Sequence, residues 1–289
     1  MATALPASDR AAEVEHFSQD GSYSVVMAPP MQKTRLIVLD DLFLSARYHS
    51  CSGESDSAGG DAEMAWLRDQ LAQAQQSGQQ VWIMGHIPTG IDPYSTARRM
   101  GAMCGHVHPV MFLSSTRLAD LLVQYADIIR LGIFAHTHMD EIRLLRPVHA
   151  ALNSASPEVV IKMIPSISPV DGNDPSFTMA RIDPANATLQ DFKMVAASNH
   201  TGIATQWSVE YDFAQTFHQS QFSPSAVRAL IAGFSADPGA ENELSRQYIR
   251  HYFIGDRSPE LKPFWPQYVC ALANYSVEAY AACVCPATR

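Results

Sequence analysis

The sequence predicts an α/β fold built in layers, followed by a helical C-terminal region. Three observations support this fold class. Between residues 21 and 134, short apolar runs alternate with segments whose apolar residues recur at helical spacing, which is typical of layered α/β domains. Two of the apolar runs end in loops that carry histidines. From about residue 207 the pattern becomes helical, with prolines between the segments.

The first part of the chain contains strands and helices in turn. Residues 1–20 are small and polar, and we expect them to be disordered. Loops are expected at 50–61 and 88–110, where Gly, Ser and Pro gather. Expected strands lie at 22–28, 34–40, 81–84 and 129–134, and expected helices at 63–76 and 113–125.

The remainder of the chain divides into a strand-rich stretch and a helical stretch. We expect strands at 142–145, 159–164, 177–182 and 188–194. We expect helices at 225–234, 241–252 and 268–282. The predicted organisation is one α/β domain over 21–206 and a helical subdomain over 207–289.

Composition excludes several classes of partner. With 289 residues, 47% of them hydrophobic, the chain can bury one large core or two small ones. Its net charge of -9 and its lack of a Lys/Arg cluster exclude a nucleic acid as the main partner. No window has the ~20 apolar residues of a membrane span, so we expect no transmembrane segment. The first residues lack the features of a signal peptide, so localisation stays open.

Two loops carry candidate metal ligands. The strand at 129–134 leads into His136 and His138, and the apolar run VWIM leads into His86. Two imidazoles at an i, i+2 spacing, where a strand ends and bends into a loop, can reach one metal centre. Imidazole suits zinc, iron and manganese. Asp140 is near enough in sequence to be an outer-shell hydrogen-bond acceptor, and a solvated carboxylate is the equal alternative.

Other histidines and the cysteines leave alternatives open. Any single loop histidine can be polar without being a ligand, and a second pair, His106 and His108, lies in a loop rich in Pro, Gly and Met. We expect that pair to line a cleft or to lie on the surface. Cys51 and Cys104 fall in two loops, whereas three further cysteines, Cys270, Cys283 and Cys285, lie near the end. Disulfides and free thiols are equally compatible with this pattern.

Several separate blocks resemble a known family. GHIPTG and AHTHMDE resemble the last two metal-binding blocks of the calcineurin-like metallophosphoesterases. GSYSVVM, RLIVLD and IPSISPVDGNDPSFTMARID resemble the acid sphingomyelinase-like branch. The resemblance implies a two-sheet sandwich with flanking helices, of which this chain would hold the C-terminal part. The strands after residue 142 would form its second sheet, and the region 207–289 a small helical subdomain.

The resemblance also implies a chemistry. Family members hydrolyse phosphoesters with two metal ions that activate a bridging water. His86 and His136 would bind the second ion and His138 the first, with zinc as the first choice. The substrate would be a phosphoester of a lipid head group or a nucleotide. The branch is secreted or lysosomal, which implies a disulfide between Cys51 and Cys104 and another between Cys270 and Cys283 or Cys285.

The chain also departs from the family pattern. The earlier Asp-x-His, Gly-Asp and Asn-His blocks are not found in it. We therefore expect this chain alone to hold at most one metal ion weakly, and to have little or no activity unless an N-terminal half complements it. The alternative is a non-catalytic relic or a binding module that keeps part of the fold.

Overall fold

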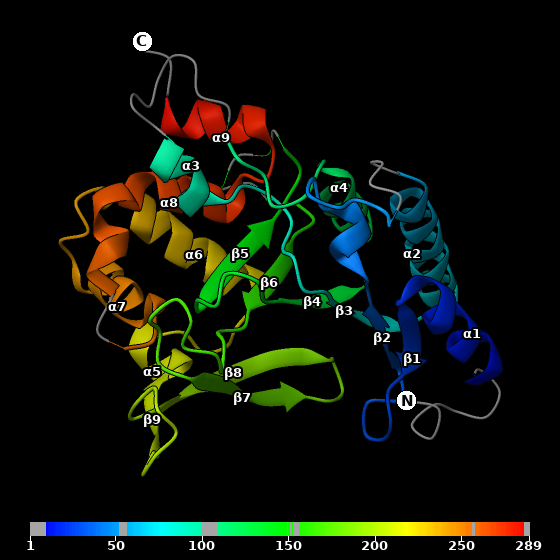
Figure 1. Cartoon of the computed structure of the whole chain (residues 1–289), viewed down its shortest axis with the longest axis horizontal. Coiled ribbons are helices and arrows are strands. Elements are labelled where there is room, and N and C mark those ends of the chain that lie inside the picture. Colours follow the sequence, from blue (N-terminus) through cyan, green and yellow to red (C-terminus); the bar gives the residue numbers. More distant parts are fainter. Residues whose placement is uncertain are drawn as a thin grey trace.

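The chain folds into two β-sheets with helices packed around them (Figure 1). The computed structural model describes residues 10–51, 57–99, 109–148, 150, 152, 156–255 and 258–285. Within these ranges a six-stranded mixed sheet has the order β1-β2-β3-β4-β6-β5, and a three-stranded antiparallel sheet has the order β7-β8-β9. The expected α/β class is confirmed.

The larger sheet has a parallel centre with antiparallel edges. β2, β3, β4 and β6 run parallel, while β1 and β5 pair antiparallel with β2 and β6. Parallel strands bring their carboxyl ends to one edge of a sheet, so the loops that follow β2, β3 and β4 gather there. The strands are β1 (Tyr23–Val26), β2 (Thr34–Val38), β3 (Gln80–Met84), β4 (Ile129–Phe134), β5 (Glu141–Leu145) and β6 (Val159–Met163).

Two helices cover one face of this sheet. Alternate side chains of β2 and β3, among them Ile37 and Ile83, share a core with Leu67 and Leu71 of α2. α4 contributes Leu122 to the same core. The covering helices are α2 (Ala58–Gln76) and α4 (Arg117–Gln124), and the 3₁₀ helix η1 (Asp41–Leu44) and the short helix α3 (Pro93–Arg99) lie in the loops near the carboxyl edge.

Residues 10–20, expected to be disordered, form the helix α1 (Arg10–Asp20). The helix is held by contacts that its polar composition does not reveal. The Glu13 carboxylate accepts a hydrogen bond from the backbone N–H of Ser24 in β1, at 2.7 Å. The His16 ring stacks on Trp66 of α2, with ring centroids 4.6 Å apart.

Strands expected in the second sheet belong partly to the first. The segments 142–145 and 159–164 correspond to β5 and β6, and every residue of both strands is buried. Strands with layers on both faces are buried throughout, which sequence alone does not distinguish from the strands of another sheet. The second sheet consists of β7 (Ser176–Asp183), β8 (Thr188–Ala197) and β9 (Trp207–Asp212).

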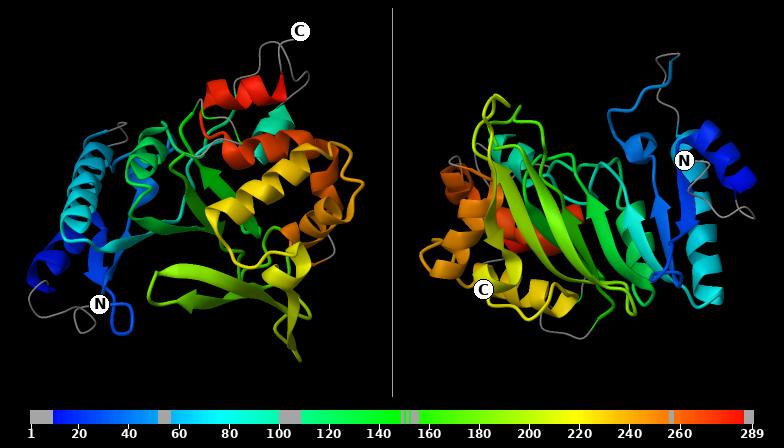
Figure 2. Two further views of the ribbon diagram at one scale, coloured as in Figure 1. Left: turned by 180° about the vertical axis from the view of Figure 1, so that it is seen from behind. Right: turned by 90° about the horizontal axis from the view of Figure 1, so that it is seen from below.

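The helical region begins at Phe213 rather than at 207, because residues 207–212 pair with β8 as strand β9. It shares one core with both sheets: Phe234 and Trp265 cluster with Leu144 of β5 and Phe192 of β8. These helices gather at one end of the molecule, with α1 and α2 at the other (Figure 2). They are α5 (Phe213–Phe217), α6 (Pro224–Ser235), α7 (Glu243–Tyr252), the 3₁₀ helix η2 (Ser258–Phe264), α8 (Trp265–Ala273) and α9 (Val277–Val284).

The helix expected over 268–282 is two helices. The chain leaves the helical conformation at Asn274, and Ser276 begins α9 by accepting a hydrogen bond from the backbone N–H of Ala279 at 3.1 Å. No helix in the described ranges is long and apolar enough to cross a membrane.

The disulfides agree with the expectation at one end of the chain only. Cys270 and Cys283 form a disulfide that joins α8 to α9, and Cys285 is also disulfide-bonded. Cys51 is exposed and free, so the expected bond between Cys51 and Cys104 is not formed. A disulfide requires two Cα atoms about 4.4–6.8 Å apart, which the placement of two cysteines in loops does not ensure. Cys104 lies outside the described residues.

Candidate metal centre

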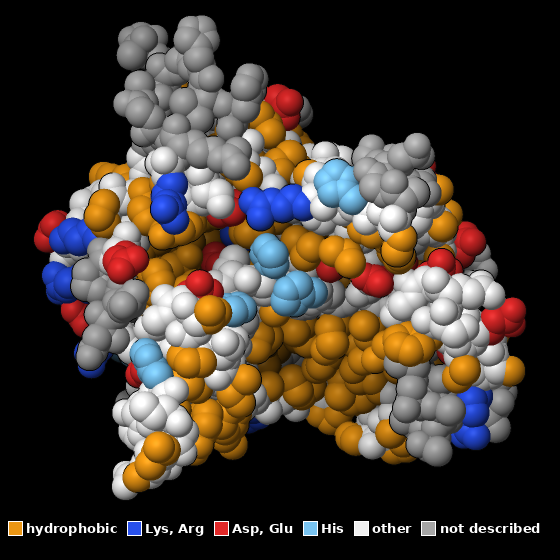
Figure 3. All heavy atoms as spheres, viewed as in Figure 1, with side chains coloured by type: hydrophobic (Ala, Val, Ile, Leu, Met, Phe, Trp, Pro, Cys, Tyr) orange, Lys and Arg blue, Asp and Glu red, His pale blue; other side chains and the backbone are white. Residues whose placement is uncertain are grey.

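Two predicted ligands meet at the carboxyl edge of the larger sheet. His86 follows β3 and His136 follows β4, which is the parallel neighbour of β3. The backbone N–H of Ala135 donates to the carbonyl of His86 at 3.0 Å, so the two loops are joined. The two imidazole rings meet edge to face with their centroids 5.3 Å apart. Histidine side chains gather on this face of the molecule (Figure 3).

His138 lies near this pair but has another partner. Its Nδ1 is 2.9 Å from a carboxylate oxygen of Asp171, in the loop between β6 and β7. Among the residues that the structure describes, no group of three His, Cys, Asp or Glu side chains is placed to hold a metal ion. The structure thus brings His86 and His136 together and gives His138 a separate carboxylate. His106 and His108 fall outside the described ranges.

The backbone at both histidines after β4 is in the left-handed region. His136 has φ 74° and His138 has φ 64°. Only a few per cent of non-glycine residues adopt such values, and those that do cluster at functional sites, where the surroundings stabilise the strain. Burial lowers the pKa of His136, and the neighbouring His86 lowers it further. Both effects favour the neutral imidazole, which is the form that binds metals.

The His86 loop is held by a buried carboxylate that was not among the site residues predicted from the sequence. Asp41, in η1 just beyond β2, accepts a hydrogen bond from the backbone N–H of Ile87 at 2.8 Å. Gly85 makes this contact possible, because a Cβ there would collide with the Asp41 carboxylate and lie 2.7 Å from the Phe134 ring. Burial raises the pKa of Asp41 to about 7. The position of Asp41 in the sequence could have indicated this role. It follows β2, which runs parallel to β3, so it reaches the same carboxyl edge of the sheet as His86.

Asp140 is not an outer-shell acceptor for these histidines in the structure, nor is it solvated. Its side chain is buried, and its carboxylate binds the Lys162 ammonium and the Tyr211 hydroxyl. Lys162 comes from β6 and Tyr211 from β9, so the carboxylate joins the two sheets. Proximity in sequence to His138 did not reveal this, because both partners are contributed by distant segments.

A cavity of about 310 Å³ lies beside His136. Four carboxylates line it, and no Lys or Arg lines it among the described residues. Asp92 has two roles, since it lines the cavity and also accepts a hydrogen bond from the backbone N–H of Ser95 at 2.9 Å in the first turn of α3. An anionic phosphate would be repelled here unless cations offset the negative charge. The four lining carboxylates are Asp92, Glu141, Asp171 and Glu260.

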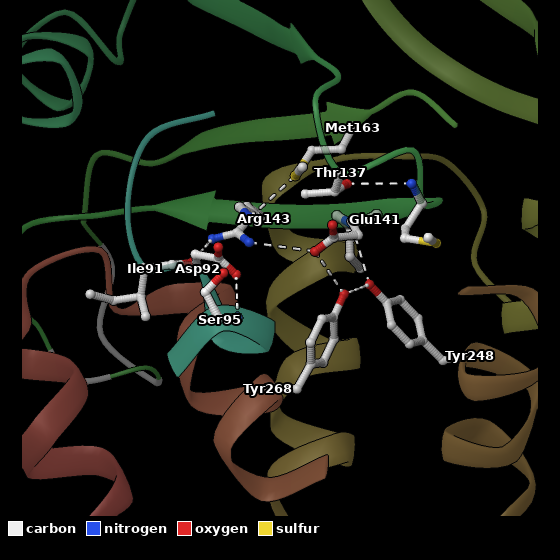
Figure 4. A network of polar contacts seen from close by, with 11 residues as sticks. Ile91, Asp92, Ser95, Thr137, Glu141, Arg143, Met163, Tyr248 and Tyr268 are labelled. Carbon is white, nitrogen blue, oxygen red and sulfur yellow. Dashed lines mark hydrogen bonds and ion pairs between the residues drawn. The ribbon is translucent and has the colours of Figure 1, made fainter. Parts of the chain in front are cut away.

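A buried polar network surrounds Glu141, one of the residues that line this cavity (Figure 4). Arg143 donates to the carbonyl of Ile91 at 2.8 Å and lies 3.4 Å from a Glu141 oxygen. Tyr268 donates to Glu141 at 3.2 Å. Burial raises the pKa of Glu141, and the Arg143 guanidinium lowers it. The sequence predicted only a strand at 142–145. Arg143 inside its apolar run and Glu141 just before it were the available signals of this network.

Comparisons with known proteins agree with the resemblance seen in the sequence. No protein-family model matches the chain. The cyclic GMP-AMP phosphodiesterase SMPDL3A of Bos taurus is 25% identical over 236 residues, covering 76% of this chain and 48% of that protein. The sphingomyelinase phosphodiesterase D of Dictyostelium discoideum is 26% identical over 279 residues, covering 94% and 58%. The human acid sphingomyelinase-like phosphodiesterase 3b is 22% identical over 281 residues, covering 93% and 57%.

The chain spans about half the length of the curated relatives it matches. Among solved structures, a dimetal phosphatase from Danio rerio aligns with 62% of this chain and 58% of its own, at 13% identity and a TM-score of 0.37. A TM-score this low does not define a shared fold. The sequence relatives establish the relationship: this chain is distantly homologous to the acid sphingomyelinase-like phosphodiesterases.

Proposed function

We propose that this chain carries part of the site of a metal-dependent phosphoester hydrolase. The observation that carries the proposal is the convergence of His86 and His136, with ring centroids 5.3 Å apart, at the carboxyl edge of two parallel strands. The Asp41 carboxylate holds the His86 loop by accepting a hydrogen bond from the backbone N–H of Ile87. The hydrogen bond from the Ala135 N–H to the His86 carbonyl joins this loop to the one that carries His136. His138, 2.9 Å from Asp171, would serve a neighbouring ion.

The residues present fit a metal ion in part. Neutral imidazoles suit zinc, which takes four ligands in most sites, so His86 and His136 would supply half of one set. We infer that this chain alone holds one zinc ion weakly. When bound, the metal would supply Lewis-acid activation of a water and of the phosphate. The chain's own residues would hold the ion, keep the His86 loop in place, and enclose the substrate beside His136.

The acidic lining of the cavity supports a requirement for metal cations in substrate binding. Because carboxylates alone contribute charge to its lining in the described part of the chain, a phosphoester would enter only with cations present. We propose a phosphodiester of a lipid head group or a nucleotide as the substrate, since the relatives are phosphodiesterases named for sphingomyelin and for cyclic GMP-AMP. Turnover would require further ligands from a complementing segment.

A binding module without catalysis is the second candidate. The absence of a three-donor cluster in the described ranges favours it. Such a protein would keep the cavity and the two-sheet frame but would not hold a metal ion tightly enough for turnover.

Metal titration distinguishes the partial hydrolase site from the binding module. Zinc binding to the apo-protein would be measured by calorimetry, and cobalt substitution would report imidazole coordination by its absorption spectrum. We expect His86→Ala and His136→Ala each to weaken binding at least about tenfold. His200→Ala is the control, because His200 is exposed and pairs with Asp174. Wild-type affinity in both site variants, together with no hydrolysis of bis(p-nitrophenyl) phosphate, would favour the binding module.

A further inference from the structure

The four carboxylates that line the cavity beside His136 are suited to an organic cation. They belong to Asp92, Glu141, Asp171 and Glu260. Among the described residues, no three acidic, histidine or cysteine side chains are placed to hold a metal ion, so these carboxylates do not form a chelating cluster. A larger cation can offset the charge of carboxylates that are spread around a cavity, because the attraction acts at a distance in a poorly hydrated site.

Glu141 contributes a buried oxygen without a hydrogen-bond partner to this lining. The residue is only 1% exposed. One of its carboxylate oxygens, Oε2, lies 3.4 Å from the Arg143 guanidinium and accepts a hydrogen bond from the Tyr268 hydroxyl at 3.2 Å. The other oxygen, Oε1, accepts no hydrogen bond from the part of the chain that the structure describes. A buried acceptor without a partner is unfavourable, so Oε1 favours a ligand that brings a donor to it.

This oxygen lies at the wall of the cavity. It points towards Thr137, which lines the same cavity (Figure 4). Burial raises the pKa of Glu141, while Arg143 and, to a lesser degree, Thr137 lower it, which places Thr137 next to the carboxylate. The Thr137 hydroxyl accepts a hydrogen bond from the backbone N–H of Met139 at 3.4 Å. A donor group of a ligand in the cavity therefore meets Glu141 and Thr137 together.

Aromatic rings complete a surface that attracts cations. Two of the rings already contact an arginine, since the Arg98 Cζ lies 5.5 Å from the centroid of Tyr94. The Arg143 Cζ lies 5.0 Å from the centroid of Phe112. The face of an aromatic ring attracts a cation, and the attraction is stronger away from water. The aromatic residues of the lining are Tyr94, Phe112, Tyr252 and Phe253.

We propose that this cavity binds the protonated primary amine of an ethanolamine-type phosphodiester, and that Glu141 is the residue that selects it. A primary ammonium has N–H donors, one of which would pair with Oε1 of Glu141. A quaternary ammonium is attracted by the same rings and carboxylates but has no N–H, so it would leave that oxygen unpaired. A nucleotide would bring only negative charge to the acidic lining.

The proposal names a substrate class for the proposed function, and it rests on that function for the position of the phosphate beside His136. Recognition of the amine itself needs no metal, because the carboxylates and rings belong to the chain. It can therefore be measured in EDTA, separately from metal binding.

The test uses the whole chain and two matched probes. Ethanolamine and choline share a positive charge and a hydroxyethyl arm, and they differ in the three methyl groups on nitrogen. Binding of each would be followed by NMR chemical-shift titration in EDTA. We expect the wild type to bind ethanolamine at least about tenfold more tightly than choline, because choline cannot donate to Glu141.

Two variants and one control assign this preference to the cavity. Glu141→Gln should reduce the preference to less than about threefold, because the buried charge is lost. Glu260→Gln removes an exposed carboxylate of the lining and should weaken both amines by about the same factor, roughly two- to fivefold. Glu278→Gln is the control, since Glu278 is exposed on α9 and is not part of the lining. Should Glu141→Gln not fold, the wild-type preference and Glu260→Gln decide the question.

Choline that binds the wild type as tightly as ethanolamine does would overturn the proposal, as would the absence of saturable binding of either amine. Equal weakening in Glu278→Gln would also overturn it, because the net charge of the chain would then explain the attraction. With zinc present, phosphoethanolamine should bind at least about tenfold more tightly than ethanolamine, since the metal offsets the phosphate charge. An amine preference without this effect of zinc would contradict the proposed function and leave the amine site standing. Zinc binding that depends on His86 and His136, with no preference between the amines, would remove the amine site alone.

Discussion

The carboxylate of Asp41 and the backbone of Ile87 are joined by a 2.8 Å hydrogen bond, and this bond fixes the loop that presents His86. Asp41 lies beyond the end of β2 and Ile87 beyond the end of β3. The contact therefore ties together two neighbouring loops at the edge where the candidate ligands gather. It stabilises the loop at the cost of burying a carboxylate, since Asp41 is only 2% exposed.

Asp41 should make stability depend on pH. Burial raises its pKa from 3.8 in the ordinary state to about 7. The folded protein then binds the proton more tightly than the unfolded chain does, so this stabilisation is complete below about pH 4 and is lost as pH rises through about 7. We expect Asp41→Asn to keep the acceptor and to reduce the loss of stability between pH 5 and pH 8 by about 1–3 kcal/mol.

Urea unfolding at the two pH values measures this effect. Asp69→Asn, at an exposed position on α2, is the control. An unchanged pH dependence in Asp41→Asn would mean that the Asp41 carboxyl does not hold its proton in the folded state. Glu63, whose pKa burial also raises to about 7, should give a second, separate reduction as Glu63→Gln.

Removing Arg143 alone should lower the free energy of unfolding far more than removing it together with the charge of Glu141. Arg143→Met leaves the Glu141 carboxylate buried without its cation, and we expect a loss of about 3–5 kcal/mol in the free energy of unfolding. The double variant with Glu141→Gln removes the stranded charge. It should recover part of that loss, as judged from a double-mutant cycle by urea denaturation. Additive losses would show that the two side chains are not coupled.

Asp140 should matter for stability and not for metal affinity. Its carboxylate is held by Lys162 and Tyr211, so Asp140→Ala leaves a buried ammonium and should destabilise the fold by about 3–5 kcal/mol. Zinc affinity, titrated below the melting temperature of the variant, should stay within about twofold of the wild type. Loss of about 10–100-fold, the effect expected for an outer-shell partner, would restore the role that its sequence position suggested.

The disulfide between Cys270 and Cys283 should stabilise the C-terminal helices. It closes a short loop, with a sequence separation of 13, and the chain-entropy model gives about 3 kcal/mol for a loop of this size. The variant Cys270→Ala/Cys283→Ala should lose stability of that order in thermal or urea unfolding. Cys51→Ser, at the exposed free thiol, is the control and should behave as the wild type does.

The sequence predicted most elements but not their partners. Apolar periodicity located β2, β3, β4 and α2, since burial on one side leaves a regular pattern. The resemblance assigned β5 and β6 to the second sheet, and the structure places both in the first. A strand buried on both faces has no pattern in its sequence that identifies its neighbours. α1 was missed altogether, as its contacts depend on Ser24 and Trp66.

By itself, the sequence determined that histidines follow neighbouring strands and that acid sphingomyelinase-like blocks are present. The resemblance implied that His86 and His136 share one ion, and the structure brings their rings together because the parallel strands β3 and β4 deliver their loops to one edge. Only the tertiary structure decided that Asp140 pairs with Lys162 and that Cys51 stays free. Those outcomes depend on which distant segments meet, and local patterns carry no information about that.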